Sequence, residues 1–287
     1  MKKALVNLNI AILLWGFTGV LGKLIILNEG WLVWYRMLFS TITVWVMDIW
    51  LKEIQKIPRA MAFRIGLNGG FQAVHWVLFF GSIHFANISV ALVCLSGSAL
   101  FTSLTEPILN RRRINIVEVL LGLVGMAGIY LIFRFESQFA KGIVLGVLSA
   151  LVLSFTSVFT KRFLQRYEPV TVTAWSMTGG WLFLSLMLPG YLYFFPEGNA
   201  IPSVTDIGWL LVLACLCTVY TWRLALRSLQ KVSAFTLTFM LNLEPVYGIV
   251  MAFMFFKEHK ELGPYFYVGL LVIAAAVLLH IRRVLSK

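Results

Sequence analysis

One acidic side chain inside an apolar run is the residue of this chain best suited to chemistry. Glu244 lies about midway along the apolar stretch 233–256 and is followed by Pro245. If this stretch crosses a membrane, a carboxyl group there costs at least about 2.5 kcal/mol unless it is protonated, paired or in contact with water. Because proline has no N–H, the carbonyl of Leu241 also loses its helical donor. Glu244 is therefore either a proton or substrate contact on a cavity wall, or a protonated acid that locks a kink.

A polar stripe along the segment 62–84 supplies the second group of candidates. At helical spacing it places Asn68, Gln72, His75, Phe79 and Ser82 on one face. Lipid cannot satisfy polar groups, so this face must contact another helix or a wet cavity. His75 is, with Glu244, a candidate for proton coupling, since the unperturbed pKa of histidine is about 6.5. The alternative for His75 is a hydrogen-bonded packing role.

Hydroxyl and aromatic side chains complete the expected cavity wall. Ser98 and Thr102 share a face of the segment 88–108, although such hydroxyls also bond to carbonyls of their own helix. Asn242 lies about 200° around an ideal helix from Glu244, so both face one cavity only if the kink rotates them. The candidate substrate-binding residues are Trp15, Thr18, Gln72, His75, Trp76, Ser98, Thr102, Thr156, Tyr220, Asn242, Glu244 and Tyr247.

The composition places these residues in a lipid bilayer. Of the 287 residues, 60% are hydrophobic and 13% are charged, and the mean hydropathy is +0.88. An ordinary soluble domain has about 25% charged residues, and a spanning helix needs about 20 mainly apolar ones. The predicted spans are 4–27, 31–51, 62–84, 88–108, 115–134, 141–162, 170–190, 207–228, 233–256 and 264–283. We therefore expect an all-α integral membrane protein with ten transmembrane helices.

The sequence gives no sign of a cofactor, a metal or a nucleic-acid partner. Cys94, Cys215 and Cys217 lie inside apolar runs without the spacing of a metal site or a disulfide framework. No P-loop is present, so ATP is not expected to drive the protein directly. The net charge of +12 is spread over loops instead of forming one basic stripe, which argues against nucleic acid. The expected partners are the bilayer and a small-molecule substrate, with protons as a candidate coupling ion.

A repeated motif divides the chain into two halves. Residues 17–23, FTGVLGK, recur as residues 155–161, FTSVFTK, each time at the polar end of an apolar run. Ser89 and Ser233 match in the same order, as do the Val-Gly pairs at 124–125 and 268–269. Because five helices are an odd number, two such halves would cross the bilayer in opposite directions, as in many secondary transporters. We predict one membrane domain made of two inverted five-helix repeats, 1–136 and 137–287.

Three segments resemble the EamA-type proteins of the drug/metabolite transporter superfamily. They are Trp15-Gly16-Phe17-Thr18-Gly19, Asn242-Leu243-Glu244-Pro245-Val246-Tyr247 and Phe256-Lys257-Glu258. In the first half, the family's helix-ending Gly-Glu is missing at Arg113-Ile114, and Glu106-Pro107 stands earlier instead. From its position, Glu106 is expected in a surface salt bridge. The resemblance implies a bundle around a central cavity, in carriers or exporters of small metabolites, often amino acids.

The positive-inside rule gives the orientation. Of the 24 Lys and Arg residues, 18 lie on the side that carries both termini. The other six are Lys23, Arg36, Arg134, Lys141, Lys257 and Lys260. We therefore expect both termini in the cytoplasm of a multi-pass protein of the bacterial cell (inner) membrane, with Lys23 and its repeat-mate Lys161 on opposite sides.

The positions of the charges limit the expected substrate. A carrier of phosphorylated compounds should hold Lys or Arg deep in its cavity. The deepest cation is expected to be Arg223, toward the cytoplasmic third of the segment 207–228. Trp15 and Thr18 occupy the region where small multidrug proteins of the superfamily carry an acid. A mostly neutral site lined by hydroxyls and aromatic rings would suit zwitterionic or weakly polar metabolites such as amino acids.

Two other functions remain alternatives. The first is a lipid flippase or scramblase of the same fold. The second is an intramembrane hydrolase with Ser98 as nucleophile and His75 as base, although no GxSxG frame surrounds the serine. We expect a transporter and not an enzyme.

Overall fold

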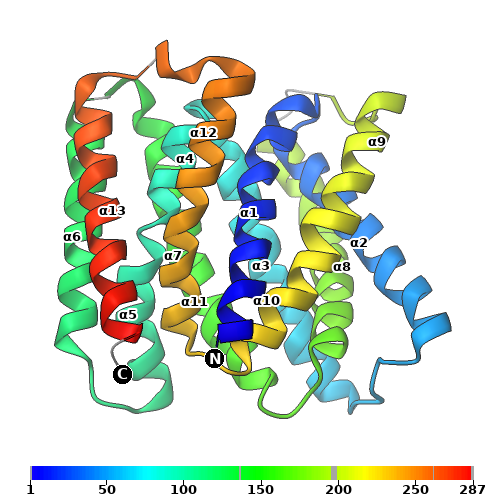
Figure 1. The fold of residues 1–287 in the computed structure, drawn as a ribbon. Coiled ribbons are helices and arrows are strands. Elements are labelled where there is room, and N and C mark those ends of the chain that lie inside the picture. The colour runs from blue at the N-terminus through cyan, green and yellow to red at the C-terminus, as the bar shows by residue number, and fades with distance from the viewer. Residues whose placement is uncertain (1, 136, 195–198, 261, 286–287) are drawn as a thin grey trace.

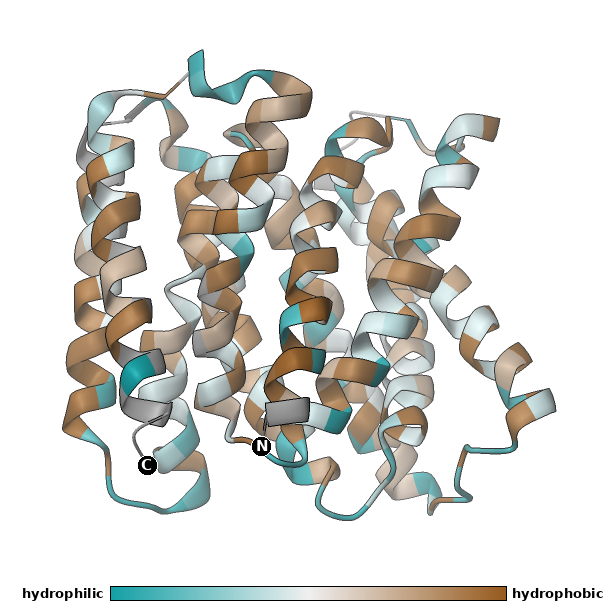
Figure 2. Cartoon of the chain, in the orientation of Figure 1, coloured by the Kyte–Doolittle hydropathy of each residue, from teal (hydrophilic) through white to brown (hydrophobic). Residues whose placement is uncertain are grey.

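The fold is a single bundle of helices. The computed structural model describes residues 2–135, 137–194, 199–260 and 262–285, and within these ranges it contains no strand. α1 begins and α13 ends at the same end of the bundle (Figure 1). Hydrophilic residues gather at the two ends, and hydrophobic residues cover the helices between them (Figure 2). This distribution fits a bundle that crosses a membrane.

The helices of the first half are α1 (Lys2–Leu24), α2 (Glu29–Leu51), α3 (Arg59–Phe85), α4 (Ile88–Leu95), α5 (Ser98–Asn110) and α6 (Ile116–Phe135). Those of the second half are α7 (Ala140–Phe163), α8 (Pro169–Phe194), α9 (Val204–Leu211), α10 (Thr221–Leu229), α11 (Ala234–Met240), α12 (Glu244–Phe256) and α13 (Pro264–Leu285). A π-helix, η2 (Val212–Tyr220), joins α9 to α10, and short 3-10 turns form η1 (Ser137–Phe139), η3 (Leu241–Leu243) and η4 (Glu258–Lys260).

Six helical segments are long and apolar enough to cross a membrane. They are Ala4–Leu24, Glu29–Leu51, Ile88–Asn110, Ala140–Phe163, Pro169–Tyr193 and Val204–Leu229. The other four predicted spans fall on α3, α6, the α11 to α12 unit and α13, which are more polar or have shorter apolar stretches. The all-helical membrane fold is thus shown, and the number of ten crossings stays a prediction.

Two helix interruptions position polar groups near the middle of the bundle. The predicted span 88–108 is broken at Ser96 and Gly97 into α4 and α5. The span 233–256 is broken by η3, so that Glu244 and Pro245 open α12. Proline is tolerated in a first helical turn, because the N–H that it lacks would have no partner inside that helix. At the predicted kink the structure thus has a short 3-10 turn between two helices, which places Glu244 at the first position of α12.

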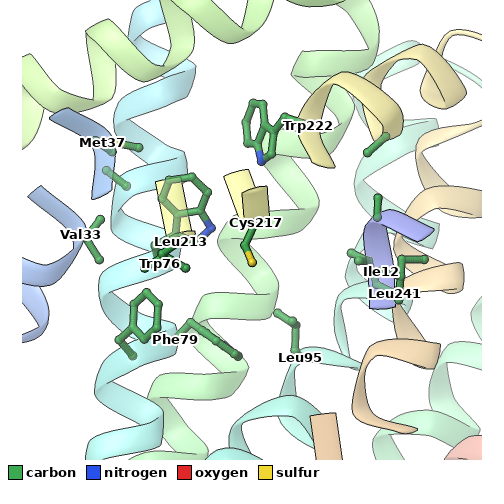
Figure 3. Packing of buried hydrophobic residues seen from close by; sticks show 14 of the residues in the cluster. Ile12, Val33, Met37, Trp76, Phe79, Leu95, Leu213, Cys217, Trp222 and Leu241 are labelled. Carbon is green, nitrogen blue, oxygen red and sulfur yellow. The ribbon is translucent and has the colours of Figure 1, made fainter. Parts of the chain in front are cut away.

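Helices α3 and α8 approach each other through glycine. A Cβ built on Gly69 would overlap the carbonyl of Ser176, and one built on Gly179 would overlap the backbone of Gly66. At these two positions no side chain fits between the helices, and α3 is held close to α8. The main hydrophobic core extends from this pair across the bundle and includes Trp76, Trp222 and Cys217 (Figure 3).

Candidate functional site

A cavity of about 90 Å³ lies at the centre of the bundle. Both halves contribute to its wall, through α1, α2 and α3 on one side and α7, α10 and α12 on the other. Its lining residues are Trp15, Thr18, Arg36, Gln72, His75, Trp76, Phe79, Leu95, Leu153, Thr156, Ser157, Thr160, Trp222, Ala225, Leu226, Leu229, Leu237, Leu241 and Glu244. The wall is thus largely apolar and aromatic, with one basic and one acidic residue.

Arg36, on α2, is the basic residue of this wall. Its side chain lies almost entirely inside the protein, with a residue exposure of 2%. Nε donates a hydrogen bond to Thr218 Oγ1 at 2.9 Å, and Thr218 Oγ1 in turn donates to Leu213 O at 2.8 Å. The guanidinium carbon lies 3.7 Å from the centroid of the Trp76 ring. The π-helix η2 therefore supplies the hydroxyl that fixes Arg36, in keeping with the frequent placement of π-helical turns at functional sites.

The guanidinium of Arg36 has no ion-pair partner within 4.0 Å among the described residues. This finding corrects the expectation of a mostly neutral cavity whose deepest cation is Arg223. Arg223 instead pairs with Glu53 at 2.6 Å and keeps 24% of its side chain exposed. The sequence does contain a signal for Arg36, because this cation interrupts the predicted span 31–51. The count of basic residues by side places Arg36 with the outer set, near the start of this span.

Glu244 is the acidic residue of the cavity wall. It is 4% exposed and stands directly after η3, at the first position of α12. In the described part of the chain, no side chain or backbone N–H donates a hydrogen bond to its carboxyl group. Glu244 and Arg36 are close enough for their charges to interact, although they form no direct contact within 4.0 Å. The carboxyl group is therefore open to a ligand or a proton.

His75, on α3, is anchored to Ser149 of α7. His75 Nδ1 lies 3.0 Å from Ser149 O and 2.7 Å from Ser149 Oγ, while Ser149 Oγ lies 3.0 Å from His75 O. Whether the serine proton goes to His75 O or to Nδ1 depends on the tautomer of His75, and in either tautomer Nδ1 is held by Ser149.

The remaining predicted cavity residues differ in what they offer. Gln72 makes no hydrogen bond within the described chain, so its amide is open. Thr18 and Thr156 donate to the carbonyls of Trp15 and Leu153 in their own helices and keep only acceptor capacity. Trp15 Nε1 donates to a hydroxyl oxygen of α10 at 2.8 Å, which leaves its ring as the contact surface.

Other predicted site residues do not line this cavity. Tyr220 is 46% exposed, and Tyr247 donates to Asn9 Oδ1 at 3.1 Å. Thr102 donates to the carbonyl of Ser98 in its own helix, at 2.8 Å. Both Ser98 and Thr102 are fully buried away from the cavity. The side chain of Asn242 lies outside the described residues.

The serine and histidine considered for a hydrolase are not brought together. His75 Nδ1 is engaged by Ser149, and the hydroxyl of Ser98 has no hydrogen-bond partner in the described structure. Nucleophilic catalysis needs a base within hydrogen-bond reach of the serine. This geometry gives the hydrolase alternative no support.

At one end of the bundle, Glu258 joins the two halves. Its carboxylate is fully buried and accepts from Ile88 N at 3.2 Å, Ser89 N at 3.1 Å and Ser89 Oγ at 2.8 Å, at the start of α4. Lys23 Nζ completes the site with an ion pair at 3.1 Å. The carboxylate of Glu258 therefore caps a helix of the other half, because it accepts from N–H groups that have no partner inside that helix.

At the opposite end, Glu106 does the same for α11. It accepts from Ala234 N at 3.2 Å and from Phe235 N at 2.8 Å. The expected surface salt bridge is therefore wrong. Lys161, the repeat-mate of Lys23, instead donates to the carbonyls of Leu229 and Val232. The two ends are thus built alike, but only the Lys23 end has the lysine in an ion pair with the glutamate.

A large space opens at each end. The one beside Lys161 has about 1090 Å³ and a basic lining of Arg64, Arg112, Lys161, Arg162, Arg166 and Lys231, with Glu106 as an acidic member. The one beside Lys23 has about 870 Å³. Asn68, on the wall of the basic space, donates to Thr160 Oγ1 on the wall of the central cavity at 3.0 Å. Asn68 also donates to Thr156 O at 3.5 Å, so the basic space and the central cavity are neighbours across this side chain.

An apolar helical bundle whose two halves share a central cavity containing a few buried polar groups has the architecture of a membrane transporter. A model of the EamA-like transporter family matches residues 2–134 and again residues 140–282. The chain therefore belongs to the EamA-like transporter family, within the drug/metabolite transporter superfamily.

A solved crystal structure supports the same fold. It is 14% identical to this chain, covers 96% of each chain and has a TM-score of 0.69. At this identity the likeness concerns the fold alone. A search of the curated proteins found no match.

Proposed function

We propose that this protein is a secondary active transporter that exports small metabolites such as amino acids, by alternating access, across the bacterial inner membrane with both termini in the cytoplasm. The observation that carries the proposal is the unpartnered carboxyl group of Glu244 on the wall of the central cavity. An ionisable group inside a membrane bundle marks a substrate or proton pathway by default. Glu244 would take up a proton from one side and release it to the other.

The conformational change of the transport cycle would involve the two glutamate contacts at the ends of the bundle. Glu258 ties η4, which follows α12, to α4, and Glu106 ties α5 to α11, at opposite ends of the bundle. Opening either end requires its contact to break while the other holds. Alternating access would thus be a rocking motion of one half against the other around the cavity.

The energy would come from a gradient of protons or of the substrate. The sequence has no P-loop, and the cavity holds a group that can bind a proton. A lipid flippase of the same fold is the alternative. The central cavity, at about 90 Å³, is bounded by side chains of both halves and is far smaller than a lipid molecule, which supports a small metabolite.

The test uses purified protein in proteoliposomes with an imposed pH gradient and labelled amino acids. Wild type should show flux that rises with the gradient, and Glu244→Gln should lose that dependence because the amide cannot carry a proton. Glu168→Gln, which changes an exposed acid in a loop, is the matched control and should behave as wild type. An unchanged gradient dependence in Glu244→Gln contradicts the proton role. A fluorescent-lipid assay in the same vesicles separates metabolite transport from lipid flipping.

A further inference from the structure

The structure assigns Arg36 a role that the family membership does not: we propose that its guanidinium binds a carboxylate of the ligand in the central cavity. The proposal rests on the transport function above, because the ligand is taken to be the transported substrate. It makes the cavity selective for compounds with a free carboxylate.

Arg36 has hydrogen-bond donors that the protein does not use. A guanidinium has five N–H donors in a planar fork. Only Nε has a hydrogen-bond partner in the described chain, the hydroxyl of Thr218 at 2.9 Å. Arg36 is only 2% exposed, so bulk water does not reach its two Nη groups. They can find hydrogen-bond acceptors only among the contents of the cavity. The binding groups therefore face the site without a protein acceptor.

The positive charge of Arg36 is buried without an ion-pair partner in the described structure. Taking a guanidinium out of water is unfavourable unless a negative group compensates it. Glu244 lines the same cavity but forms no ion pair with Arg36 within 4.0 Å. A ligand carboxylate can approach the free edge of the fork and form two parallel hydrogen bonds. Because Glu244 forms no ion pair with Arg36, the acid does not occupy the Nη groups of the fork.

The guanidinium of Arg36 is fixed in place by its neighbours. Arg36 is held from one side by Thr218, which is itself bonded to Leu213 O, and its guanidinium stacks on the Trp76 ring at 3.7 Å. Trp76 in turn packs edge-on against Trp222, with ring centroids 6.1 Å apart. A fork fixed in this way loses little further conformational freedom when a ligand binds. Stacking on an aromatic face also stabilises the positive charge.

The chemistry favours carboxylate over phosphate. Arg36 is the only Lys or Arg among the residues that line the described cavity, and Glu244 balances it. A phosphate with close to two negative charges would meet one cation and one acid. A single carboxylate matches a single planar fork, and an amino group on the same ligand would find the carboxyl group of Glu244 in the same space.

The test measures binding to purified full-length protein in detergent, without transport. The probes are four carboxylates, namely acetate, glycine, leucine and phenylalanine, and the four matching carboxamides. We expect at least one carboxylate to raise the melting temperature and to bind in calorimetry, with its carboxamide at least tenfold weaker. Equal binding of a carboxylate and its amide, or no binding by any of the four carboxylates, overturns the proposal.

Two substitutions of Arg36 test whether this residue causes the preference for carboxylate. Arg36→Gln should remove the preference for carboxylate, and Arg36→Lys should weaken carboxylate binding about tenfold, because lysine lacks the planar fork. Arg223→Gln, which removes a cation paired with Glu53 outside the cavity, is the matched control and should bind as wild type. Retained carboxylate preference in Arg36→Gln refutes the role of Arg36. If neither Arg36 variant folds, the comparison of each acid with its amide in wild type still tests whether the cavity selects carboxylates.

This outcome is separable from that of the transport proposal. Carboxylate binding that depends on Arg36, without any flux in proteoliposomes, refutes transport and leaves the binding site. Gradient-driven flux that is the same for acids and amides refutes the binding inference alone.

Discussion

Two residues of opposite charge, Arg36 and Glu244, face the same cavity from different halves of the chain. Each is more than nine-tenths buried, and neither has an ion-pair partner within 4.0 Å in the described structure. Charges in a poorly polarisable interior interact over longer distances than they do in water. The pair therefore remains coupled through the cavity although it is not in contact.

This coupling gives a prediction at the scale of single residues. Arg36→Gln and Glu244→Gln should each lower the melting temperature, because each leaves the opposite charge without compensation. The double variant should be more stable than the sum of the single effects implies, by about 0.5 to 3 kcal/mol in a double-mutant cycle. Thermal unfolding in detergent at fixed pH measures it. Strictly additive effects would show that the two charges do not interact.

Sequence patterns found some of these residues and missed others for physical reasons. Glu244 was recognisable because an acid beside a proline stands out in an apolar run. The stripe on α3 was recognisable by its period, and Asn68, Gln72 and His75 are indeed all buried. Arg36 was missed because a count of basic residues by side treats every cation as a loop residue. Whether a cation near the start of a span lies in a loop or in a cavity depends on what packs around it.

At the scale of helices, two acids that accept hydrogen bonds from helix starts connect the halves at the two ends of the bundle. The Glu258 carboxylate receives three hydrogen bonds from α4 and one ion pair from Lys23, and it is completely buried. Glu106 receives two backbone N–H groups of α11. Buried acceptors of this kind stabilise because the donors that they satisfy would otherwise remain unpaired.

Glu258→Gln should therefore destabilise the protein by about 2 kcal/mol, since hydrogen bonds to a charged acceptor are stronger than those to an amide. The amide also turns two donors toward N–H groups that need an acceptor. Unfolding in mixed micelles with increasing denaturing detergent measures the change. Glu168→Gln, at an exposed position, should unfold as wild type. Equal stability of the two variants would mean that the contact contributes nothing.

The helix interruptions show what a single sequence predicts less well. Pro245, which cannot donate inside a helix, predicts a kink at Glu244, and the structure has the 3-10 turn η3 directly before it. The break at Ser96 and Gly97 and the π-helix η2 were not expected. Their hydrogen-bond patterns depend on tertiary contacts, such as that of Thr218 with Arg36, which local composition does not encode.

At the scale of the whole molecule, the repeated motif places equivalent lysines at opposite ends. Lys23 lies with Glu258 at the start of α4, whereas Lys161 lies beside Arg162, which donates to the end of α5. Since α4 and α5 follow one another along the bundle, these are its two ends. The predicted inverted repeats require such a placement of the two lysines.

Labelling from each side of the membrane tests this topology. In a variant with Cys94, Cys215 and Cys217 replaced by serine, Arg166→Cys should react with an impermeant thiol reagent only from the cytoplasmic side. Ile201→Cys, which is 84% exposed in the loop beside the Lys23 end, should react only from the outside. Inside-out and right-side-out vesicles distinguish the two. Reaction of both cysteines from one side contradicts the inverted topology.

The crossed arrangement of Glu106 and Glu258 has a consequence for how the chain is assembled. Each half donates the acid that completes a helix of its counterpart, so an isolated half would keep one bare helix start and one carboxylate without its donors. Synthesis proceeds from the amino end, so α4 must wait for Glu258, which is made only after α12. The earlier half is thus finished by the later one, and a gene cut between them would yield two polypeptides that mature only as a mutual pair.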